Sequence, residues 1–423
     1  TQSLALEVLA EAFEPSRILE PRPTRPVASA AIPALFLNYD ASWARTQGPA
    51  TTAVDRGLLT EWGWSSELGV FLSTHVARWV REGQAPVVGQ SRRLETNWTR
   101  DWPQRDFSLR LGDSWTHAST WGRQAAFAGL QVGSSRALWV DGSSNVNPVL
   151  MGSALTPSTV ELYVNEVLRQ SVQVPAGPFS LENVVPMQGA GETRLVVRDL
   201  LGRETAVTRA FFNSPRLRSP GQQEWSLEIG RLRKGFGMTP SVEGYGEPVV
   251  QAWWRRGVAE GLTLESRLQG GGGLLQGGLA ASASVFRQAL LEGAIAFSNQ
   301  DGRQGASVLM GLQRQGVRDG LSLRVVTSQR DYTEAGRLPQ ERPARVEGSL
   351  SWQEALADGN AWGVSVATLR RYDGLVVSTG SVSYTQRLSS WGSLVWSTTH
   401  IESDRPTPAY GAAGLSGRST RVQ

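Results

Sequence analysis

The sequence has no cysteine and only three histidines in 423 residues. The absence of cysteine excludes disulfide bonds, thiolate catalysis and cysteine-based zinc sites. His75, His117 and His400 lie far apart in the sequence, which argues against a metal site built on histidine. No apolar run reaches the ~18 residues that a transmembrane helix needs, so the sequence predicts no such helix.

Charge is also scarce. Charged residues make up 19% of the chain, against ~25% in a typical soluble protein. The net charge of +4 comes without a cluster of basic residues, so we expect no nucleic-acid partner. The glycine-rich stretch 270–278 lacks the lysine and the following helix of a phosphate-binding loop. We therefore expect no cofactor, no metal ion and no small-molecule substrate.

What the chain does contain is alternation of apolar and polar residues, in segments separated by Gly, Asp, Asn or Pro. In 262–269, Leu264 and Leu268 share one face of a strand, and Glu265 and Arg267 share the other. Strands of about 9–11 residues have the length that spans a membrane, whereas a typical strand has ~5–6 residues. The predicted strands are 35–45, 57–66, 69–79, 92–101, 106–112 and 123–132, followed by a series from 224 to about 400.

The fold class that follows is all-β, with a transmembrane antiparallel β-barrel whose strands face lipid on one side and a polar lumen on the other. A soluble β-sandwich, which exposes its polar face to water, is the alternative. Glu265, Arg267 and Arg324 on the lumen face have two interpretations. They could pair across the lumen or with an inserted domain, or a water-filled pore could simply tolerate them.

Residues 153–214 interrupt the series of long strands. Their strands are shorter, with hairpin turns and a compact apolar set, which predicts a small β-sandwich inserted between barrel strands. A long loop is the alternative, although loops of this length without structure of their own are uncommon. Pro175, Gly177 and Pro178 predict a turn in this sandwich, and Phe179 is expected in its core.

The N-terminal residues 1–34 differ from the rest. Apolar residues alternate at positions 4, 6 and 8, as in a strand, and five prolines between 15 and 33 then predict an extended linker. The chain is thus expected to divide into four parts: 1–34, the end of an N-terminal domain and a linker; 35–152, barrel strands; 153–214, the sandwich; and 215–423, further barrel strands.

The stretch LRLGDSWTHASTWGR brings Asp113, Ser114 and His117 within five residues, which are the residue types that a serine hydrolase uses. It has no G-x-S-x-G elbow, and no D-x-x-H element follows it in the chain. We therefore expect no catalytic residue and no enzymatic activity. The pattern instead predicts a strand that ends at Gly112, a turn in which Asp113 and Ser114 bond backbone amides, and a new strand from Arg123.

Four stretches of the chain resemble the outer-membrane fimbrial ushers of the chaperone–usher pathway. The most specific elements are the Gly-Asp-Ser at 112–114, the Trp-Gly-Arg at 121–123, and V-P-x-G-P-F at 174–179. The four stretches are 33–43, 92–134, 157–204 and 226–248. The resemblance therefore covers most of 33–250, while residues 250–423 share only the alternating pattern.

The resemblance implies a non-enzymatic pore in the bacterial outer membrane, surrounded by lipid, that assembles and exports pilus subunits. It implies chaperone–pilus subunit complexes from the periplasm as partners. It also implies that the inserted sandwich is a plug domain. It also places a hairpin before the plug, where a gating contact with the plug is plausible. The residues of this hairpin are Gly112, Asp113, Ser114, Trp121, Gly122 and Arg123.

The chain also departs from the family pattern. At about 20 residues for each strand and its connection, the sequence holds roughly 15 barrel strands, which are too few to close an usher barrel. We therefore expect a partial barrel, and a fragment that does not export subunits is one alternative. Another outer-membrane channel, porin-like or a passive transporter, is the second alternative for the function.

Overall fold

The computed structural model consists almost entirely of β-strands. Among the described residues, the one helical element is a single 3-10 turn, Pro103–Arg105, and no helix there is long and apolar enough to cross a membrane. The described residues are 16–19, 32–47, 52–83, 86–134, 150–154, 158–164, 167–174, 177–182, 189–199, 204–213, 216–234, 244–285, 289–316, 318–337, 343–356, 360–387, 393–404 and 419–422.

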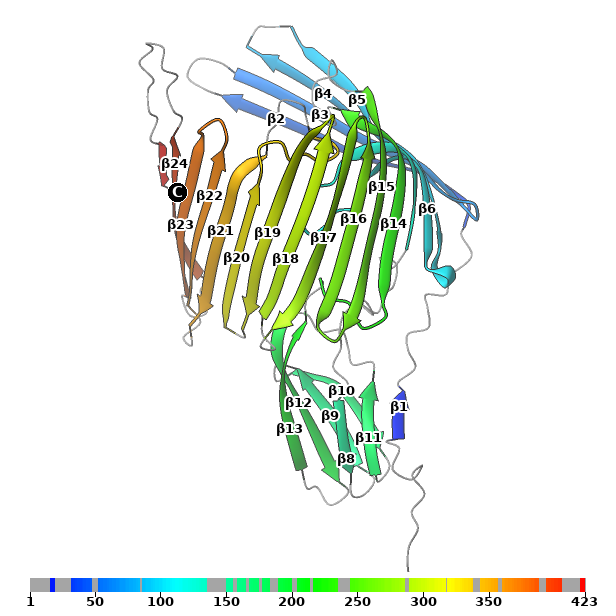
Figure 1. The fold of residues 1–423 in the computed structure, drawn as a ribbon, viewed down its shortest axis with the longest axis vertical. Coiled ribbons are helices and arrows are strands. Elements are labelled where there is room, and N and C mark those ends of the chain that lie inside the picture. The colour runs from blue at the N-terminus through cyan, green and yellow to red at the C-terminus, as the bar shows by residue number, and fades with distance from the viewer. Residues whose placement is uncertain are drawn as a thin grey trace, which may run out of the picture.

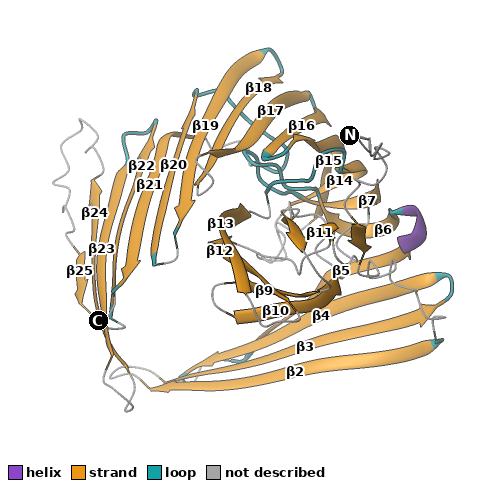
Figure 2. Ribbon diagram, turned by 90° about the horizontal axis from the view of Figure 1, so that it is seen from below, coloured by secondary structure: helices purple, strands orange, loops and turns teal. Residues whose placement is uncertain are grey.

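Among the described residues, eighteen strands form one antiparallel barrel (Figures 1 and 2). Each pairs with the next along the chain, except that β7 pairs with β14 across the inserted segment. The strands are β2 (Ala34–Gln47), β3 (Thr52–Ser66), β4 (Gly69–Glu82), β5 (Val88–Trp102), β6 (Phe107–Trp115), β7 (Ala126–Gly133), β14 (Gln223–Lys234), β15 (Gly244–Ala259), β16 (Leu262–Gly271), β17 (Leu274–Val285), β18 (Ala289–Gln300), β19 (Arg303–Gln315), β20 (Asp319–Ser328), β21 (Ala344–Ala355), β22 (Ala361–Arg371), β23 (Val376–Arg387), β24 (Ser393–Asp404) and β25 (Ser419–Val422).

The two faces of each strand meet different surroundings, as the alternation predicted. In β16, Leu264 and Leu268 are 39% and 62% exposed on the outer face. Glu265 and Arg267, one residue away, are buried inside the barrel at 4% and 1% exposure. An apolar outer surface around a polar interior is the pattern of a barrel in lipid, so the predicted all-β barrel is confirmed.

The number of barrel strands is larger than the predicted fifteen. The prediction allowed about 20 residues for each strand and its connection, but several turns are much shorter. Only Gly272 and Gly273 separate β16 from β17, and Asp301 and Gly302 separate β18 from β19. Within the described residues, the ladders run in chain order from β2 to β25, and the partial barrel stays a prediction.

The inserted segment, together with the short strand β1 from the N-terminal region, forms two small sheets outside the barrel wall. One has the order β10-β9-β12-β13, and the other β1-β11-β8. Figure 1 shows this sandwich beyond one end of the barrel rather than within it. Val160, Leu162, Phe179 and Leu195 are among its buried apolar residues. The strands are β1 (Ser16–Leu19), β8 (Leu150–Ala154), β9 (Ser158–Val164), β10 (Val167–Val174), β11 (Gly177–Glu182), β12 (Gly189–Asp199) and β13 (Glu204–Asn213).

The N-terminal region differs in one respect from the sequence prediction. The strand predicted around residues 4–8 lies outside the described residues. Residues 16–19, predicted as part of an extended linker, form β1 and join the sheet of β11 and β8.

Candidate functional site

The predicted turn at Asp113 and Ser114 is wrong, because β6 continues through both residues to Trp115. Gly112 makes this continuation feasible. Its φ is +108°, a backbone conformation that side-chain-bearing residues avoid, and a Cβ there would collide with the backbone oxygen of Thr96. The connection from β6 to β7 is the segment 116–125, which we call the lumenal loop.

Asp113, which is itself buried, lies at the centre of a polar network that joins four barrel strands. Its carboxylate accepts the backbone N–H of Thr96 at 2.9 Å and the hydroxyl of Tyr245 at 2.7 Å. The guanidinium of Arg93 pairs with the same carboxylate, and that of Arg233 lies 3.6 Å away. The partners come from β5, β14 and β15, so Asp113 connects the strands on both sides of the inserted segment.

The three residues that suggested a hydrolase do not assemble into one. The Ser114 hydroxyl donates to Gln131 at 2.7 Å, and the carboxylate of Asp113 faces Arg93 instead. The His117 ring stacks on Trp253, with ring centroids 3.6 Å apart. A nucleophile–base–acid arrangement requires hydrogen bonds between these groups, and each of them is engaged elsewhere.

The lumenal loop folds back into the barrel and is held there by buried carboxylates. Thr120 donates its backbone N–H at 2.9 Å and its hydroxyl at 2.7 Å to Glu265. The backbone N–H of His117 donates to Glu228 at 3.2 Å, and Gln251 donates to the His117 carbonyl at 3.0 Å. Figure 2 shows loop segments inside the barrel next to β14–β18.

The sequence indicates no role for His117 once the hydrolase arrangement is rejected, yet this residue is an anchor of the lumenal loop. Burial, reinforced by the guanidinium of Arg255, lowers the pKa of His117 to about 4. The imidazole is therefore neutral at pH 7. A neutral ring stacked on Trp253 costs less desolvation free energy than a charged one, which suits this buried position.

Trp121 and Gly122 bring the lumenal loop against the barrel wall. Trp121 packs on the apolar cluster that includes Leu309, next to Gly278, where a side chain would collide with the indole. The guanidinium of Arg267 lies over the indole ring, 5.5 Å from its centroid. A side chain at Gly122 would occupy the position of that guanidinium, so a larger residue at this point would have to displace Arg267.

A second loop braces the first. The segment 329–337 after β20, which we call the brace loop, places Glu334 beside the lumenal loop. Glu334 accepts the backbone N–H of Arg123 at 3.0 Å and pairs with Arg267 at 3.0 Å and Arg337 at 3.3 Å. The sequence alone gives no sign of this loop, because Glu334 and Arg123 are 211 residues apart and no local pattern reports the contact.

The charged residues on the lumen face therefore have specific partners. Glu265 pairs with Arg255 at 2.9 Å and holds Thr120. Arg267 donates to the Arg123 carbonyl at 3.2 Å, and Arg324 donates to the Thr120 carbonyl at 3.3 Å. The interpretation that water alone solvates these charges is wrong, since all three contact the loops inside the barrel.

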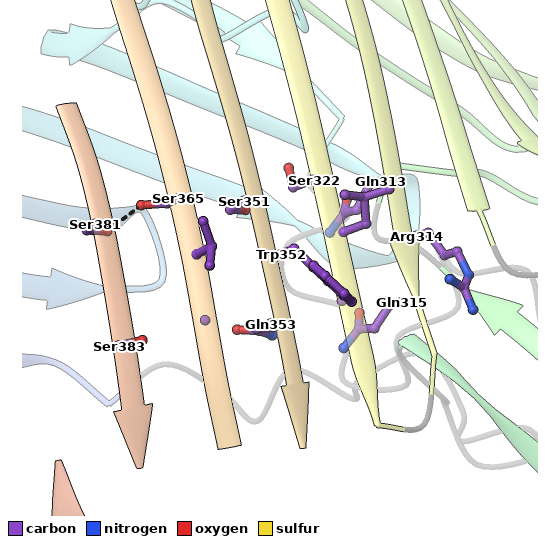
Figure 3. A pocket seen from close by; sticks show the side chains of 14 residues that line it. Gln313, Arg314, Gln315, Ser322, Ser351, Trp352, Gln353, Ser365, Ser381 and Ser383 are labelled. Carbon is purple, nitrogen blue, oxygen red and sulfur yellow. Dashed lines mark hydrogen bonds between the residues drawn. The ribbon is translucent and has the colours of Figure 1, made fainter. Parts of the chain in front are cut away.

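The part of the wall formed by β20–β23 is different in character. Ser322, Ser351, Ser365 and Ser381 occupy matching register positions on β20–β23, and Figure 3 shows them in a row. They lie on the same face as Arg324 and line a pocket of about 370 Å³. Ser365 and Ser381 share a hydrogen bond of 2.6 Å. This wall presents short, uncharged polar groups to the lumen.

The four sandwich residues singled out by the sequence fall around β11. Pro175 lies outside the described residues. Gly177 and Pro178 begin β11 and pair with β8. The Phe179 side chain has 0% exposure. The contacts of the lumenal loop given above all go to the barrel wall and the brace loop.

Comparison with known proteins gives the family. The family model described as "Outer membrane usher protein" matches residues 72–403. The outer membrane usher protein FimC of Bordetella pertussis is 31% identical over 183 residues, which are 43% of this chain and 20% of that protein. PefC of Salmonella typhimurium is 26% identical over 208 residues, which are 48% of this chain and 24% of that protein. The matched segments thus span about a quarter of the relatives or less.

Solved structures show the same fold. The translocation pore of the P pilus usher PapC aligns with a TM-score of 0.56 and 15% identity, over 88% of this chain and 78% of that one. PapC in a P pilus tip assembly intermediate from E. coli, with PapD, PapK and PapG, aligns with a TM-score of 0.63 and 16% identity, over 94% and 50%. Since the family model covers more than half of the sequence, the chain belongs to the family of outer membrane usher proteins.

Proposed function

We propose that this chain forms the pore of an outer-membrane usher, which receives pilus subunits from a periplasmic chaperone and exports them through the barrel without a chemical step. The relative with the PapC fold is part of a P pilus tip assembly intermediate with PapD, PapK and PapG. The observation that carries the proposal is the barrel itself. Its apolar outer face is suited to lipid, and loops anchored by buried charges occupy its interior.

The division of the chain follows from the proposal. Residues 1–34 are the end of a periplasmic N-terminal domain and a linker, and 35–152 and 215–423 are barrel strands. Residues 153–214 are the plug, a sandwich that closes the lumen at rest. Its placement beyond the barrel end in Figure 1 corresponds, under this proposal, to a state in which the plug has left the lumen.

The lumenal loop and the strand before it act as the gating hairpin. Its residues hold the hairpin in two ways: Asp113 ties its base to neighbouring strands, and Trp121 inserts its tip against the wall. When the plug enters the lumen, it meets this hairpin. The serine row on β20–β23 lines part of the lumen with short, uncharged side chains, which suits the passage of a folded subunit.

The test is subunit export by cells. The chain is produced in the outer membrane of a strain that lacks its own usher but makes a periplasmic chaperone and pilus subunits from the same gene neighbourhood. We expect the chain to co-purify chaperone–subunit complexes and to bring subunits to the cell surface. Heat-modifiable gel mobility shows in the same samples that the barrel is folded. A folded barrel that retains no chaperone–subunit complex contradicts the proposal.

A further inference from the structure

The short strand β1 forms a parallel pair with β11 of the sandwich (Figure 1). Ser16 pairs with Phe179, and the register continues to Leu19 opposite Glu182. The two strands are separated in the chain by six barrel strands and three sandwich strands. A contact between such distant segments is not a by-product of local chain geometry, since parallel neighbours need a long connection.

The edge of the sandwich at β11 is suited to pairing with another strand. Without β1, β11 would pair only with β8, and a two-stranded ribbon is marginally stable. Its free side would carry a row of unpaired backbone N–H and C=O groups. The pairing with β1 completes a three-stranded sheet next to the fully buried Phe179.

Prolines define the extent of this contact on both strands. Pro178 has no N–H to donate, and the β1 ladder begins one residue later, at Phe179. On the other side, Pro15 and Pro21 bracket the sequence SRILE. Because proline cannot continue a ladder as a donor, the sequence limits this docking segment to about four residues.

We propose that the free edge of β11 is a docking site for residues 16–19, and that this parallel strand addition tethers the sandwich outside the barrel. The docking segment lies in the linker directly before the first barrel strand. Its capture by β11 therefore fixes the sandwich to the same end of the barrel where the chain enters the wall. The tethering role rests on the proposed function of the sandwich as a plug, whereas the docking itself does not.

Cysteine cross-linking in the full chain tests the docking. The sequence has no cysteine, so two introduced cysteines are the only thiols. Arg17 and Ser180 are in register on adjacent strands, about 4.8 Å apart, within the Cα separation of about 4.4–6.8 Å that a disulfide spans. We expect the variant Arg17→Cys/Ser180→Cys to form a disulfide under mild oxidation in at least about half of the chains.

The matched control moves one cysteine to the other side of β11. Met151 is in register with Ser180 on β8, so Arg17 and Met151 are two strand spacings apart, about 9.6 Å, beyond disulfide reach. We expect Arg17→Cys/Met151→Cys to cross-link at least tenfold less. Equal yields in the two variants would show an undirected linker and would overturn the docking.

A proline variant separates strand pairing from proximity. In the Arg17→Cys/Ser180→Cys background, Ile18→Pro removes a backbone donor from the middle of β1 and should lower the disulfide yield severalfold. Thr24→Pro, in the linker beyond β1, should leave it unchanged. If both proline variants cross-link fully, pairing through the backbone is refuted.

Conductance then tests the tether separately. In planar bilayers, the cross-linked chain should stay in its conducting state, and reduction with dithiothreitol should restore closures. If the disulfide forms in register but reduction leaves the conductance unchanged, the docking stands and the tethering role is overturned. A pore that never closes, cross-linked or not, counts against the plug function itself.

Discussion

The ion pair between Arg267 and Glu334 offers the sharpest test of how the lumenal loop is held. The Arg267 side chain has 0% exposure and that of Glu334 6%, with 3.0 Å between the paired atoms. Removing one partner of a buried pair typically costs ~3–5 kcal/mol, because the other charge stays buried without compensation. Glu334→Gln keeps an oxygen that can accept the N–H of Arg123, so we expect the lower end, about 3 kcal/mol.

This cost falls on local opening of the lumenal loop, since the barrel ladders do not depend on Glu334. A free energy of about 3 kcal/mol corresponds to roughly a 100-fold larger open population. Hydrogen exchange of the amides in 116–125, measured on the folded chain in detergent, should therefore accelerate by about that factor. Exchange in the wall strand β17 should stay unchanged.

Two further variants test whether the buried pair of Arg267 and Glu334 holds the lumenal loop. Asp55→Asn removes the exposed pair with Arg78, whose side chains are 37% and 64% exposed, and should change exchange little because such pairs contribute ~0–1 kcal/mol. Arg267→Met combined with Glu334→Gln should recover part of the protection, since the Arg267 charge is no longer buried without its carboxylate partner. If Glu334→Gln leaves exchange in 116–125 at the level of the unmodified chain, the brace loop does not hold the lumenal loop.

Three other results are expected. Gly112→Ala should destabilise the barrel by ~1–3 kcal/mol, because alanine is strained at a φ of +108°. The urea midpoint of this variant should fall, and Ala128→Gly on β7 serves as a control without that strain. Deleting 153–214 should raise single-channel conductance and the sensitivity of cells to large antibiotics, and unchanged permeability would contradict a plug. The pKa of His117 is lowered from 6.5 to about 4 in the anchored loop, so the released loop binds a proton more readily. Anchoring of the lumenal loop should therefore weaken as the pH falls from 6.5 towards 4. His117→Gln should abolish this pH dependence of hydrogen exchange in 116–125.

The strands were predictable because two solvents act on every one of them. Lipid on one side and a polar lumen on the other impose the alternation seen in Leu264, Glu265 and Arg267, and this period of two is readable in a single sequence. The turn at Asp113 was mispredicted for a local reason. Gly-Asp-Ser is typical turn chemistry, but Gly112 takes up a positive φ within a continuous strand, and Asp113 finds its partners on other strands.

The candidate site was predictable only in part. The sequence identified Trp121, Gly122 and Arg123 from their resemblance to a family, but nothing in it indicated that Glu334 would bond Arg123 or that Arg267 would cover Trp121. Likewise, the V-P-x-G-P-F element marked β11, while its pairing with residues 16–19 was not foreseen. Each of these contacts joins segments more than 100 residues apart.

By itself, the sequence determined the class of fold, the alternation of the strands and the position of the inserted sandwich, because these depend on which residues are neighbours along the chain. Only the tertiary structure decided where the lumenal loop folds, which carboxylates hold it, and which segment pairs with β11. Those contacts depend on the curvature of eighteen strands, which brings distant side chains to one place. The burial that makes their charges costly, and therefore specific in their partners, exists only once the barrel has formed.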